Sequence, residues 1–439
     1  MHILVVGGGL AGLTAAIRDT QLGAQVTLLE KGDRLGGSFI YSSGYVWSYK
    51  DLPAYRSEAP GGDPDLQDLI LERLSPTIGW LESITYPALT HETENPLTFG
   101  ARFDPEDTVA ALAERIEGSG GRILTDAALN GLLKDSAGRM TGVRFSSNGE
   151  KRELAADAVI LASGGFAANE KLVGRYIIGG PGKMRLRAHP RSTGDGFLAA
   201  LDAGALESGG LDEFYGRNLP APPAEFSPEK FVEVSQLYGR YAVAINANGE
   251  RNTDEAADWS ETTLPRATAH QPDLHAYYIL DAAGLQSRVR ERTALDMVEA
   301  ARRAGGTVLE SPSIEGFADR LSEHGLPRDN VLRTLEEYNA AITGGRGAEL
   351  SPPRTGPAAP VRVPPFVAVE VAPTITHTVG GLAVDGGCRV LRRADGCPIP
   401  GLYAAGVEVG GVSTGGYTSG LASALVFGGV AAESAVGDG

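Results

Sequence analysis

The sequence predicts an α/β protein, in which a parallel-sheet domain is built from discontinuous pieces of chain and an α+β domain is inserted into it. Three observations support this. The chain opens with an apolar strand, a glycine-rich turn and a small-residue helix; Pro and aromatic residues become frequent after about residue 211; strands with glycine clusters return near residue 366. We therefore expect residues 1–211 and 363–439 to form one domain and residues 212–362 the other. A chain of 439 residues is long enough for two or three domains of roughly 100–200 residues each.

The composition argues against several classes of protein. Hydrophobic residues make up 42% of the chain and charged residues 21%, which is ordinary for a globular protein. The formal net charge of −16 argues against nucleic acid or an anionic membrane surface as the main partner. No Cys or His spacing typical of zinc, haem or an iron–sulfur cluster occurs, so we expect no metal site.

The cellular location is predicted from the absence of two sequence patterns, a signal peptide and a membrane span, and from the cysteines. The first residues show no signal-peptide pattern, and the longest uncharged stretch, Val409–Ala432, is rich in Gly, Ser and Thr and lacks flanking Lys or Arg. We expect no membrane span and a cytoplasmic protein. Cys388 and Cys397 could form a hairpin disulfide, but two thiols in a reducing cytosol are the commoner case.

The elements of the first domain follow from apolar periodicity. Ile3–Val6 and Gln25–Leu29 have the apolar character of parallel strands, with a small-residue helix over 13–21 between them. An amphipathic helix is expected near residue 65 and another after Asp104-Pro105, and Asn148-Gly149 predicts a hairpin turn. Residues 157–162 read as one more buried strand.

The inserted domain has a different pattern. A hairpin is expected at residues 246–249 and helices near residues 286–304 and 328–342. Four prolines between residues 352 and 360 mark the expected return to the first domain.

The glycine-rich turn predicts a dinucleotide site. Gly7-x-Gly9-x-x-Gly12 follows a strand and opens a helix, and Glu30 lies 18 residues later at the end of the second strand. This is the Rossmann-like arrangement, in which a pyrophosphate lies at the helix N-terminus and the acidic residue holds ribose hydroxyls. Lys31 and the Gly36-Gly37-Ser38 segment continue along the ligand, as the longer FAD molecule requires. One such fingerprint is visible, so a second site for NAD(P)H is not expected.

At this point the chain resembles the fumarate reductase/succinate dehydrogenase flavoprotein family, which includes the 3-ketosteroid dehydrogenases. The resemblance covers almost the whole chain and rests on ordered motifs. These are Glu30-Lys31, Gly36-Gly37-Ser38, Ser43-Gly44, residues 158–166 with Asn169, Thr193–Gly196, Asn246–Arg251, Pro373–Gly381 and Ile399–Gly406. The resemblance implies a flavin domain with an inserted capping domain. Residues 39–44 contain no counterpart of the family's covalent flavin histidine, so we expect FAD to bind without a covalent bond.

The motifs imply a set of cofactor contacts. In chain order the expected contacts are Gly7, Gly9, Gly12, Glu30, Lys31, Gly36, Gly37, Ser38, Ser43, Gly44, Ala128, Ala162, Gly164, Asn169, Asp195, Gly406, Glu408, Gly420 and Leu421. The family's usual Glu directly after Gly406 is displaced here, because Val407 stands in its place and Glu408 follows.

The sequence departs from fumarate chemistry where the family uses arginines. Residues 394–439, which include the expected position of the arginine that clamps the substrate, contain no Lys, Arg or His. The proton-donating arginine would fall near residues 259–261, where Trp259 stands, and Arg266 is off register. We therefore expect that fumarate is not the substrate.

Phenol and hydroxyl groups stand where a cation is expected. Tyr417-x-Ser419 precedes an expected helix, and His377 matches a substrate-contact position of the family, so Tyr417, Ser419 and His377 are the candidate catalytic residues. Packing of the Tyr417 ring, an N-cap role for Ser419 and a backbone-satisfied His377 are the alternatives. Tyr45, Trp47 and Gly416 are candidate substrate contacts, although the first two could be core, and the tyrosines of the inserted domain stay open.

The expected function is an FAD-dependent dehydrogenase that forms a C=C bond next to a ketone on an apolar, cyclic substrate. The alternative is an enoate or enone reductase of the fumarate reductase type, and a flavin scaffold without activity is the least expected. The electron acceptor could be oxygen, a quinone or a redox protein.

Overall fold

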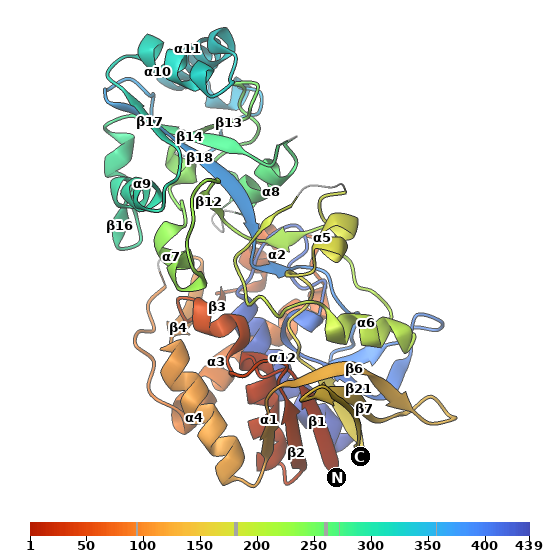
Figure 1. The fold of residues 1–439 in the computed structure, drawn as a ribbon. Coiled ribbons are helices and arrows are strands. Elements are labelled where there is room, and N and C mark those ends of the chain that lie inside the picture. Colours follow the sequence, from red (N-terminus) through yellow and green to blue (C-terminus); the bar gives the residue numbers. More distant parts are fainter. Residues whose placement is uncertain (94, 180–182, 259–261, 272, 357) are drawn as a thin grey trace. The chain divides into compact units, whose positions relative to one another are not determined.

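The chain of the computed structural model divides into two compact units, and the structure describes residues 1–93, 95–179, 183–258, 262–271, 273–356 and 358–439 (Figure 1). Unit 1 comprises Met1–Ile177, Ala188–Phe214 and His377–Gly439, and unit 2 comprises Ile178–Arg187 and Tyr215–Thr376. Unit 2 thus extends past the predicted end at residue 362. The reason is strand β18 (Phe366–Ile375), which is hydrogen-bonded along its length to other strands of unit 2.

Unit 1 is built on a six-stranded sheet in the order β20-β21-β9-β1-β2-β5, in which all neighbours are parallel except β20 and β21. The α/β fold predicted from the opening strand–turn–helix pattern is confirmed. The strands are short and strongly apolar, as expected for a parallel sheet covered on both faces. Their bounds are β1 His2–Val6, β2 Gln25–Leu29, β5 Arg122–Leu124, β9 Ala158–Leu161, β20 Arg389–Leu391 and β21 Pro398–Ala404.

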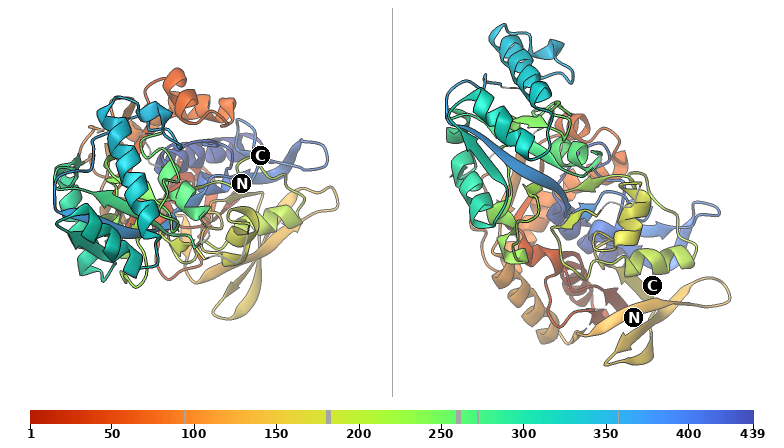
Figure 2. Two further views of the ribbon diagram at one scale, coloured as in Figure 1. Left: turned by 90° about the horizontal axis from the view of Figure 1, so that it is seen from above. Right: turned by 45° about the horizontal axis from the view of Figure 1, so that its top comes forward.

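Helix α1 (Leu10–Gln21) packs against the last helix, α12 (Gly420–Gly437), and against α4 (Pro105–Gly118). By length and composition α12 could cross a membrane, but 61% of it is buried within the structure, as in a core helix. Both ends of the chain lie in unit 1 and close together, as Figure 2 also shows. The other helices of this unit are η1 Gly37–Tyr41, α2 Leu52–Glu58, α3 Pro64–Ile84, α5 Glu170–Tyr176, α6 Asp195–Asp202 and η6 Gly406–Glu408.

Two small antiparallel sheets complete unit 1. Strands β6 (Ala127–Lys134), β7 (Met140–Ser147) and β8 (Glu150–Ala155) form a meander, with the predicted Asn148-Gly149 turn between the last two. Strands β3 (Tyr45–Tyr49) and β4 (Thr98–Arg102) pair with each other.

Unit 2 is built around the ten-residue strand β18, which pairs with β14 (Ala276–Leu280), β17 and β12 antiparallel and with β10 parallel. Side chains of β14 alternate between two separate apolar clusters, because successive residues of a strand point to opposite faces. Helix α9 (Ala294–Arg303) contributes to one cluster, and α10 (Ile314–Glu323) and α11 (Arg328–Thr343) contribute to the other. The remaining strands are β10 Arg185–Leu186, β12 Asn218–Pro220, β13 Val243–Ile245, β15 Arg288–Val289, β16 Arg292–Thr293 and β17 Val308–Ser311.

Three helices of unit 2 begin after a capping residue or a proline: Thr293 caps α9, Ser313 caps α10, and Pro327 precedes α11. The helix predicted near residues 286–304 begins at Ala294, because the preceding residues form the β15–β16 hairpin and Thr293 caps the helix. The bounds are η2 Pro228–Lys230, α7 Phe231–Val234, η3 Gly239–Tyr241, α8 Thr263–Ala269, η4 Gly284–Gln286, α9 Ala294–Arg303, α10 Ile314–Glu323, α11 Arg328–Thr343 and η5 Gly347–Glu349. Strands β11 (Phe214–Tyr215) and β19 (His377–Thr378) lie where the chain passes from one unit to the other.

Candidate active site

The carboxyl edge of the parallel sheet in unit 1 gathers the predicted cofactor residues. Gly7 follows β1, Glu30 follows β2, Ala162 follows β9 and Gly406 follows shortly after β21. These strands are parallel neighbours, so their carboxyl ends meet at one edge of the sheet, where ligands bind in open α/β sheets.

The three glycines of the first turn have different physical roles. A Cβ on Gly7, whose φ is +112°, would lie 2.3 Å from the carbonyl oxygen of Ala162, and one on Gly12 would lie 1.9 Å from the carbonyl oxygen of Gly7. Both positions therefore require glycine for packing. A Cβ on Gly9 would meet no atom within 4 Å. Gly9 is the N-cap of α1, with no side-chain cap, so the open space lies where helix N–H groups can bind an anion.

Glu30 is fixed by backbone groups on both sides. Its Oε2 accepts a hydrogen bond from Gly8 N at 2.8 Å, and its Oε1 accepts one from Gly32 N at 2.6 Å. The carbonyl of Glu30 accepts from Ala127 N at 2.9 Å, which places the start of β6, with Ala128, beside this loop. The carboxylate is thus held at the edge of the sheet in one orientation.

A second polar network joins Lys31 to residues far along the chain. Lys31 Nζ lies 2.7 Å from Asp195 Oδ2 and donates to Thr193 Oγ1 at 2.6 Å. The amide of Asn169 donates to the Thr193 carbonyl at 2.9 Å, while its oxygen caps helix α5. The side chains of Lys31, Asn169 and Asp195 therefore hold the loops around the edge together.

Glu408 is a buried carboxyl group at the same edge. It is 0% exposed, its Oε1 accepts from Ser163 Oγ and more weakly from Gly165 N at 3.4 Å, and its Oε2 has no hydrogen-bond partner among the described residues. Burial raises the pKa of this carboxyl, partly offset by the hydrogen bond from Ser163. A buried oxygen without a partner is costly, and a bound polar ligand would satisfy it.

Aromatic rings line the start of α12. The ring of Tyr417 lies 5.6 Å from Trp47, edge to face, and 5.9 Å from His377, and it is 8% exposed. The hydroxyl of Tyr49 donates to the Tyr417 carbonyl at 2.9 Å. A Cβ on Gly420 would lie 2.9 Å from the His377 ring, so His377 is packed directly against the helix N-terminus. The structure thus brings three predicted residues, Trp47, His377 and Tyr417, into one group.

Ser419 and Gly416 have evident structural roles beside this group. Ser419 Oγ accepts from Ala422 N at 3.3 Å as the N-cap of α12 and donates to the Tyr45 carbonyl at 3.2 Å. A Cβ on Gly416 would lie 1.6 Å from the Glu58 carbonyl oxygen, so packing alone requires glycine there.

Comparison with known families identifies the chain. The model of the family described as FAD binding domain matches residues 86–423, and that of FAD dependent oxidoreductase matches residues 2–165. The chain belongs to the FAD binding domain family. The resemblance predicted from the ordered motifs is therefore confirmed, and so is FAD as the cofactor.

Two relatives of this chain are named for oxidoreductase activities. NADH:fumarate oxidoreductase of Klebsiella pneumoniae is 27% identical over 99% of this chain, and the chain spans 47%, about half, of its length. The 4-oxocyclohexanecarboxylate 2-dehydrogenase of Sinomonas cyclohexanicum is 23% identical over 94% of this chain and 88% of its own length.

Two solved structures share the fold of this chain. The 3-ketosteroid Δ1-dehydrogenase of Sterolibacterium denitrificans matches 100% of this chain and 99% of its own at 19% identity, with a TM-score of 0.80. The open form of a flavocytochrome c3 fumarate reductase matches 100% of this chain and 78% of its own at 22% identity, with a TM-score of 0.76.

The residues at the sheet edge fit FAD. The open space at Gly9 and the N-terminus of α1 suit the pyrophosphate, Glu30 suits a ribose, and the unsatisfied Glu408 Oε2 suits a hydroxyl donor such as the ribityl chain. Gly36 and Gly37 lie alongside, since Gly36 N donates to the Gly8 carbonyl at 2.8 Å.

Several predicted cofactor residues are engaged with the protein itself. Gly44, at φ +76°, packs on the Phe103 carbonyl, and the Ser43 carbonyl accepts from Arg102. Gly164 and Gly406 both have positive φ values, of +94° and +65°. Leu421 lies in the first turn of α12, directly after Gly420. Their contacts with the cofactor remain predictions, and we expect backbone atoms to make these contacts more than side chains.

His189 is a residue of this edge that sequence reasoning missed. Its backbone N–H donates to Ser38 Oγ at 3.0 Å, and its ring stacks on Tyr41 at 5.8 Å. Burial lowers the pKa of His189, opposed by the nearby Glu30 carboxylate. The available signal was its position, four residues before the Thr193–Gly196 motif.

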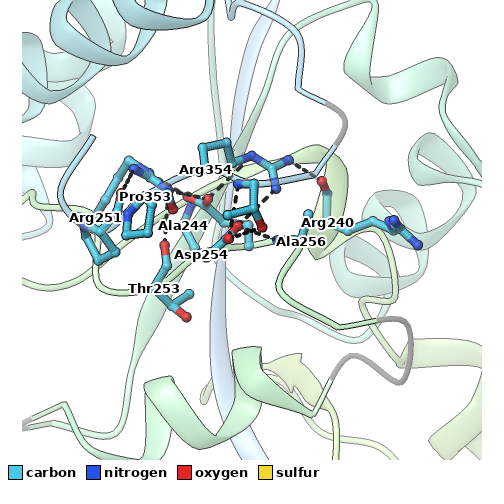
Figure 3. Close-up of polar contacts among 11 residues, drawn as sticks. Arg240, Ala244, Arg251, Thr253, Asp254, Ala256, Pro353 and Arg354 are labelled. Carbon is cyan, nitrogen blue, oxygen red and sulfur yellow. Dashed lines mark hydrogen bonds and ion pairs between the residues drawn. The ribbon is translucent and has the colours of Figure 1, made fainter. Parts of the chain in front are cut away.

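The position expected for a proton-donating arginine, residues 259–261, lies outside the described residues. The chain leading to it is anchored in unit 2 by a buried charged cluster (Figure 3). Arg251 donates to both Glu255 oxygens, at 2.9 and 2.6 Å, and Arg354 lies 3.6 Å from Glu255 and 3.7 Å from Asp254. Arg251 also binds the carbonyls of Pro352 and Pro353. Arg251, the one arginine of the Asn246–Arg251 motif, and Arg354 therefore serve the fold of unit 2.

Proposed function

We propose that this protein is an FAD-dependent dehydrogenase that forms a C=C bond next to the carbonyl group of an apolar, cyclic ketone. The observation that carries the proposal is the aromatic group at the N-terminus of α12, formed by Trp47, His377 and Tyr417. Residues 394–439, which include Tyr417 and α12, contain no Lys, Arg or His. An aromatic surface of this kind suits a neutral, largely apolar substrate, and residues 394–439 offer no arginine to pair with a carboxylate.

The roles of the residues follow from the chemistry. Removing a proton next to a carbonyl leaves negative charge on the ketone oxygen, which hydrogen-bond donors must stabilise. We assign this role to the Tyr417 hydroxyl, with His377 as a second donor, and assign Trp47 and Tyr45 to the apolar wall. Bound FAD supplies the acceptor for the hydride. Ser419 positions the end of α12 as its N-cap.

A reductase of enoates or enones is the second candidate. This candidate is favoured by the relative named as a fumarate oxidoreductase, to which 99% of the present chain is similar. The same donors would then polarise the carbonyl of an unsaturated substrate, and the electron partner would set the direction. We expect the electron acceptor of a dehydrogenase to be oxygen, a quinone or a redox protein, and the location to be cytoplasmic.

Anaerobic half-reactions test the proposal. The oxidised holoenzyme is mixed with steroid ketones, cyclohexanones, enones and dicarboxylates, and flavin bleaching is followed. Bleaching by a saturated ketone, with the unsaturated ketone as product, is the expected result. Tyr417→Phe should keep FAD and slow bleaching by roughly 100-fold. If no ketone bleaches the flavin while an enone reoxidises the reduced enzyme, the reductase is the correct assignment.

A further inference from the structure

The turn before α12, residues 411–418, is bound by a carboxylate from a distant segment of unit 1. Both oxygens of Glu213 accept from Gly415 N, Oε2 at 2.9 Å and Oε1 at 3.1 Å. The two residues are 202 positions apart in the sequence, and Gly415 is two residues before Tyr417. Glu213 belongs to unit 1, in the segment Ala188–Phe214. The function proposed above gives this side chain no role.

The backbone of Glu213 also binds the strand that carries His377. Val379, two residues after His377, donates its N–H to the Glu213 carbonyl at 3.1 Å. The carbonyl of Val379 in turn accepts from Gly411 N, at the start of the turn, at 3.0 Å. Three segments of unit 1 are therefore joined in a closed ring of hydrogen bonds, and Glu213 supplies two of its acceptors.

The connection between α2 and α3 binds the turn in a different way. Gly61 N donates to the Thr414 carbonyl at 2.9 Å. Asp63 N donates to the Gly411 carbonyl, also at 2.9 Å. These contacts are to carbonyl groups of the turn, whereas the Glu213 carboxylate binds an N–H group. Loss of the Glu213 side chain would therefore leave the carbonyl contacts in place and remove the acceptor of the amide nearest to Tyr417.

The bond from Gly415 N is of the stronger kind and lies in a part of the turn that needs it. A hydrogen bond to a carboxylate is roughly twice as strong as one between neutral groups. Gly415 has a φ of +83°, a conformation that glycine adopts without strain, so its own backbone does not restrict it to one arrangement. Glu213 is partly buried, which protects the bond from water in part.

We propose that Glu213 is a positioning residue: through Gly415 it fixes the turn so that the Tyr417 hydroxyl is held in one place relative to His377. This rests on the proposed dehydrogenase function, in which both side chains donate to the ketone oxygen. Donors stabilise a developing negative charge only where they already point at it, and a displacement of about 1 Å can cost roughly 100-fold in rate. Glu213 acts through the turn and not by contact with the substrate.

The first test measures the turn without turnover. Amide hydrogen exchange of the FAD-loaded enzyme is followed by mass spectrometry, with overlapping peptides that resolve Gly415. In Glu213→Ala this amide should exchange about tenfold faster or more, while peptides of α1 keep the wild-type rate. Glu213→Gln keeps one acceptor oxygen and should lie between the two. Asp212, the exposed neighbour, provides the matched control Asp212→Asn, which should leave the exchange unchanged.

The second test asks whether Glu213 acts through the Tyr417 hydroxyl. The anaerobic bleaching rate is measured at saturating concentrations of a saturated cyclic ketone that bleaches the wild-type flavin. Glu213→Ala should lower this rate by about tenfold or more with FAD still bound, and Glu213→Gln should restore part of it. In the Tyr417→Phe background the same change should have an effect within about twofold, because no hydroxyl is left to position. A merely structural role would slow both backgrounds by the same factor.

The two proposals fail separately. If no ketone bleaches the wild-type flavin, the dehydrogenase function is contradicted, while the exchange of the Gly415 amide still measures whether Glu213 fixes the turn. If Glu213→Ala does not fold, Glu213→Gln takes its place in both tests, with smaller effects in the same direction. Unchanged exchange at Gly415, or equal slowing with and without the Tyr417 hydroxyl, overturns the role of Glu213 and leaves the dehydrogenase function standing.

Discussion

The burial of the acidic residue Asp19 has a cost in folding free energy that can be measured. Asp19 lies on α1, is 0% exposed, and neither carboxylate oxygen has a hydrogen-bond partner among the described residues. Burial raises the pKa of Asp19 to about 8. An aspartate in an unfolded chain titrates near 4, so the folded protein holds a proton between about pH 4 and 8 that the unfolded chain releases.

The first prediction concerns the pH dependence that follows. Because folding takes up this proton, the free energy of unfolding should fall as pH rises through that window, with a contribution of at most about 1.4 kcal/mol per pH unit from this group. Asp19→Asn should remove that part of the slope. Urea unfolding at several pH values between 5 and 8 measures it. Asp202, an exposed residue of α6, provides the control Asp202→Asn, which should keep the wild-type slope; equal slopes in both variants would refute the role of Asp19.

At the scale of elements, two glycines in the turn into α1 have different roles, because Gly9 leaves open space for a ligand whereas Gly12 is required for packing. Our second prediction tests this difference. A Cβ at position 9 enters open space, so Gly9→Ala should fold normally and lose FAD affinity by about tenfold or more, through obstruction of the anion site. A Cβ at position 12 lies 1.9 Å from the Gly7 carbonyl oxygen, so Gly12→Ala should destabilise the protein itself by roughly 1–3 kcal/mol. Thermal melting of the FAD-free protein and FAD titration distinguish the two. Equal melting temperatures would contradict the packing role of Gly12.

A third prediction concerns the start of α12. Ser419→Ala removes the N-cap hydrogen bond to Ala422 N and should cost about 1 kcal/mol of stability. Its effect on turnover should be smaller than that of Tyr417→Phe, which leaves the helix cap intact. Chemical unfolding and the reductive half-reaction of both variants measure this. A larger catalytic loss in Ser419→Ala than in Tyr417→Phe would move the chemical role to the serine.

The sequence predicted what depends on neighbours along the chain. The turn at Gly7–Gly12, the strands beside it and the acidic Glu30 are local patterns, so the fold of unit 1 and its cofactor could be inferred from them. The place of His189 could not be inferred, because its contacts with Ser38 and Tyr41 join segments about 150 residues apart in the sequence. The end of the inserted domain was predicted at residue 362, whereas unit 2 extends to Thr376. The prolines near residue 352, which we expected to mark the return to the first domain, instead belong to a buried cluster in which Arg251 binds the carbonyls of Pro352 and Pro353.

At the scale of the whole molecule, the fourth prediction is that FAD binds without a covalent bond. Residues 39–44, where the family's histidine would stand, contain none. Acid precipitation of the holoenzyme should release yellow flavin into the supernatant. Flavin that stays in the washed pellet would contradict the prediction.

The fifth prediction concerns dicarboxylates. Residues 394–439 contain no Lys, Arg or His, so this part of the site has no arginine to bind a carboxylate through two hydrogen bonds, and fumarate and succinate should be neither turned over nor bound tightly. Fumarate-dependent oxidation of a reduced dye measures this. Turnover within the usual enzyme range of about 1–1,000 per second would overturn it.

The packing of α12 on α1 has a consequence for how the protein is made. These helices are separated by almost the entire chain, and residues 215–376 of unit 2 are synthesised between them. While translation proceeds, helix α1 therefore has no α12 to pack against, and closing so long a loop is a slow, non-local step. A nascent chain on the ribosome should accordingly be unable to retain flavin until α12 has emerged, and should depend on chaperones to shield the apolar face of α1 until then.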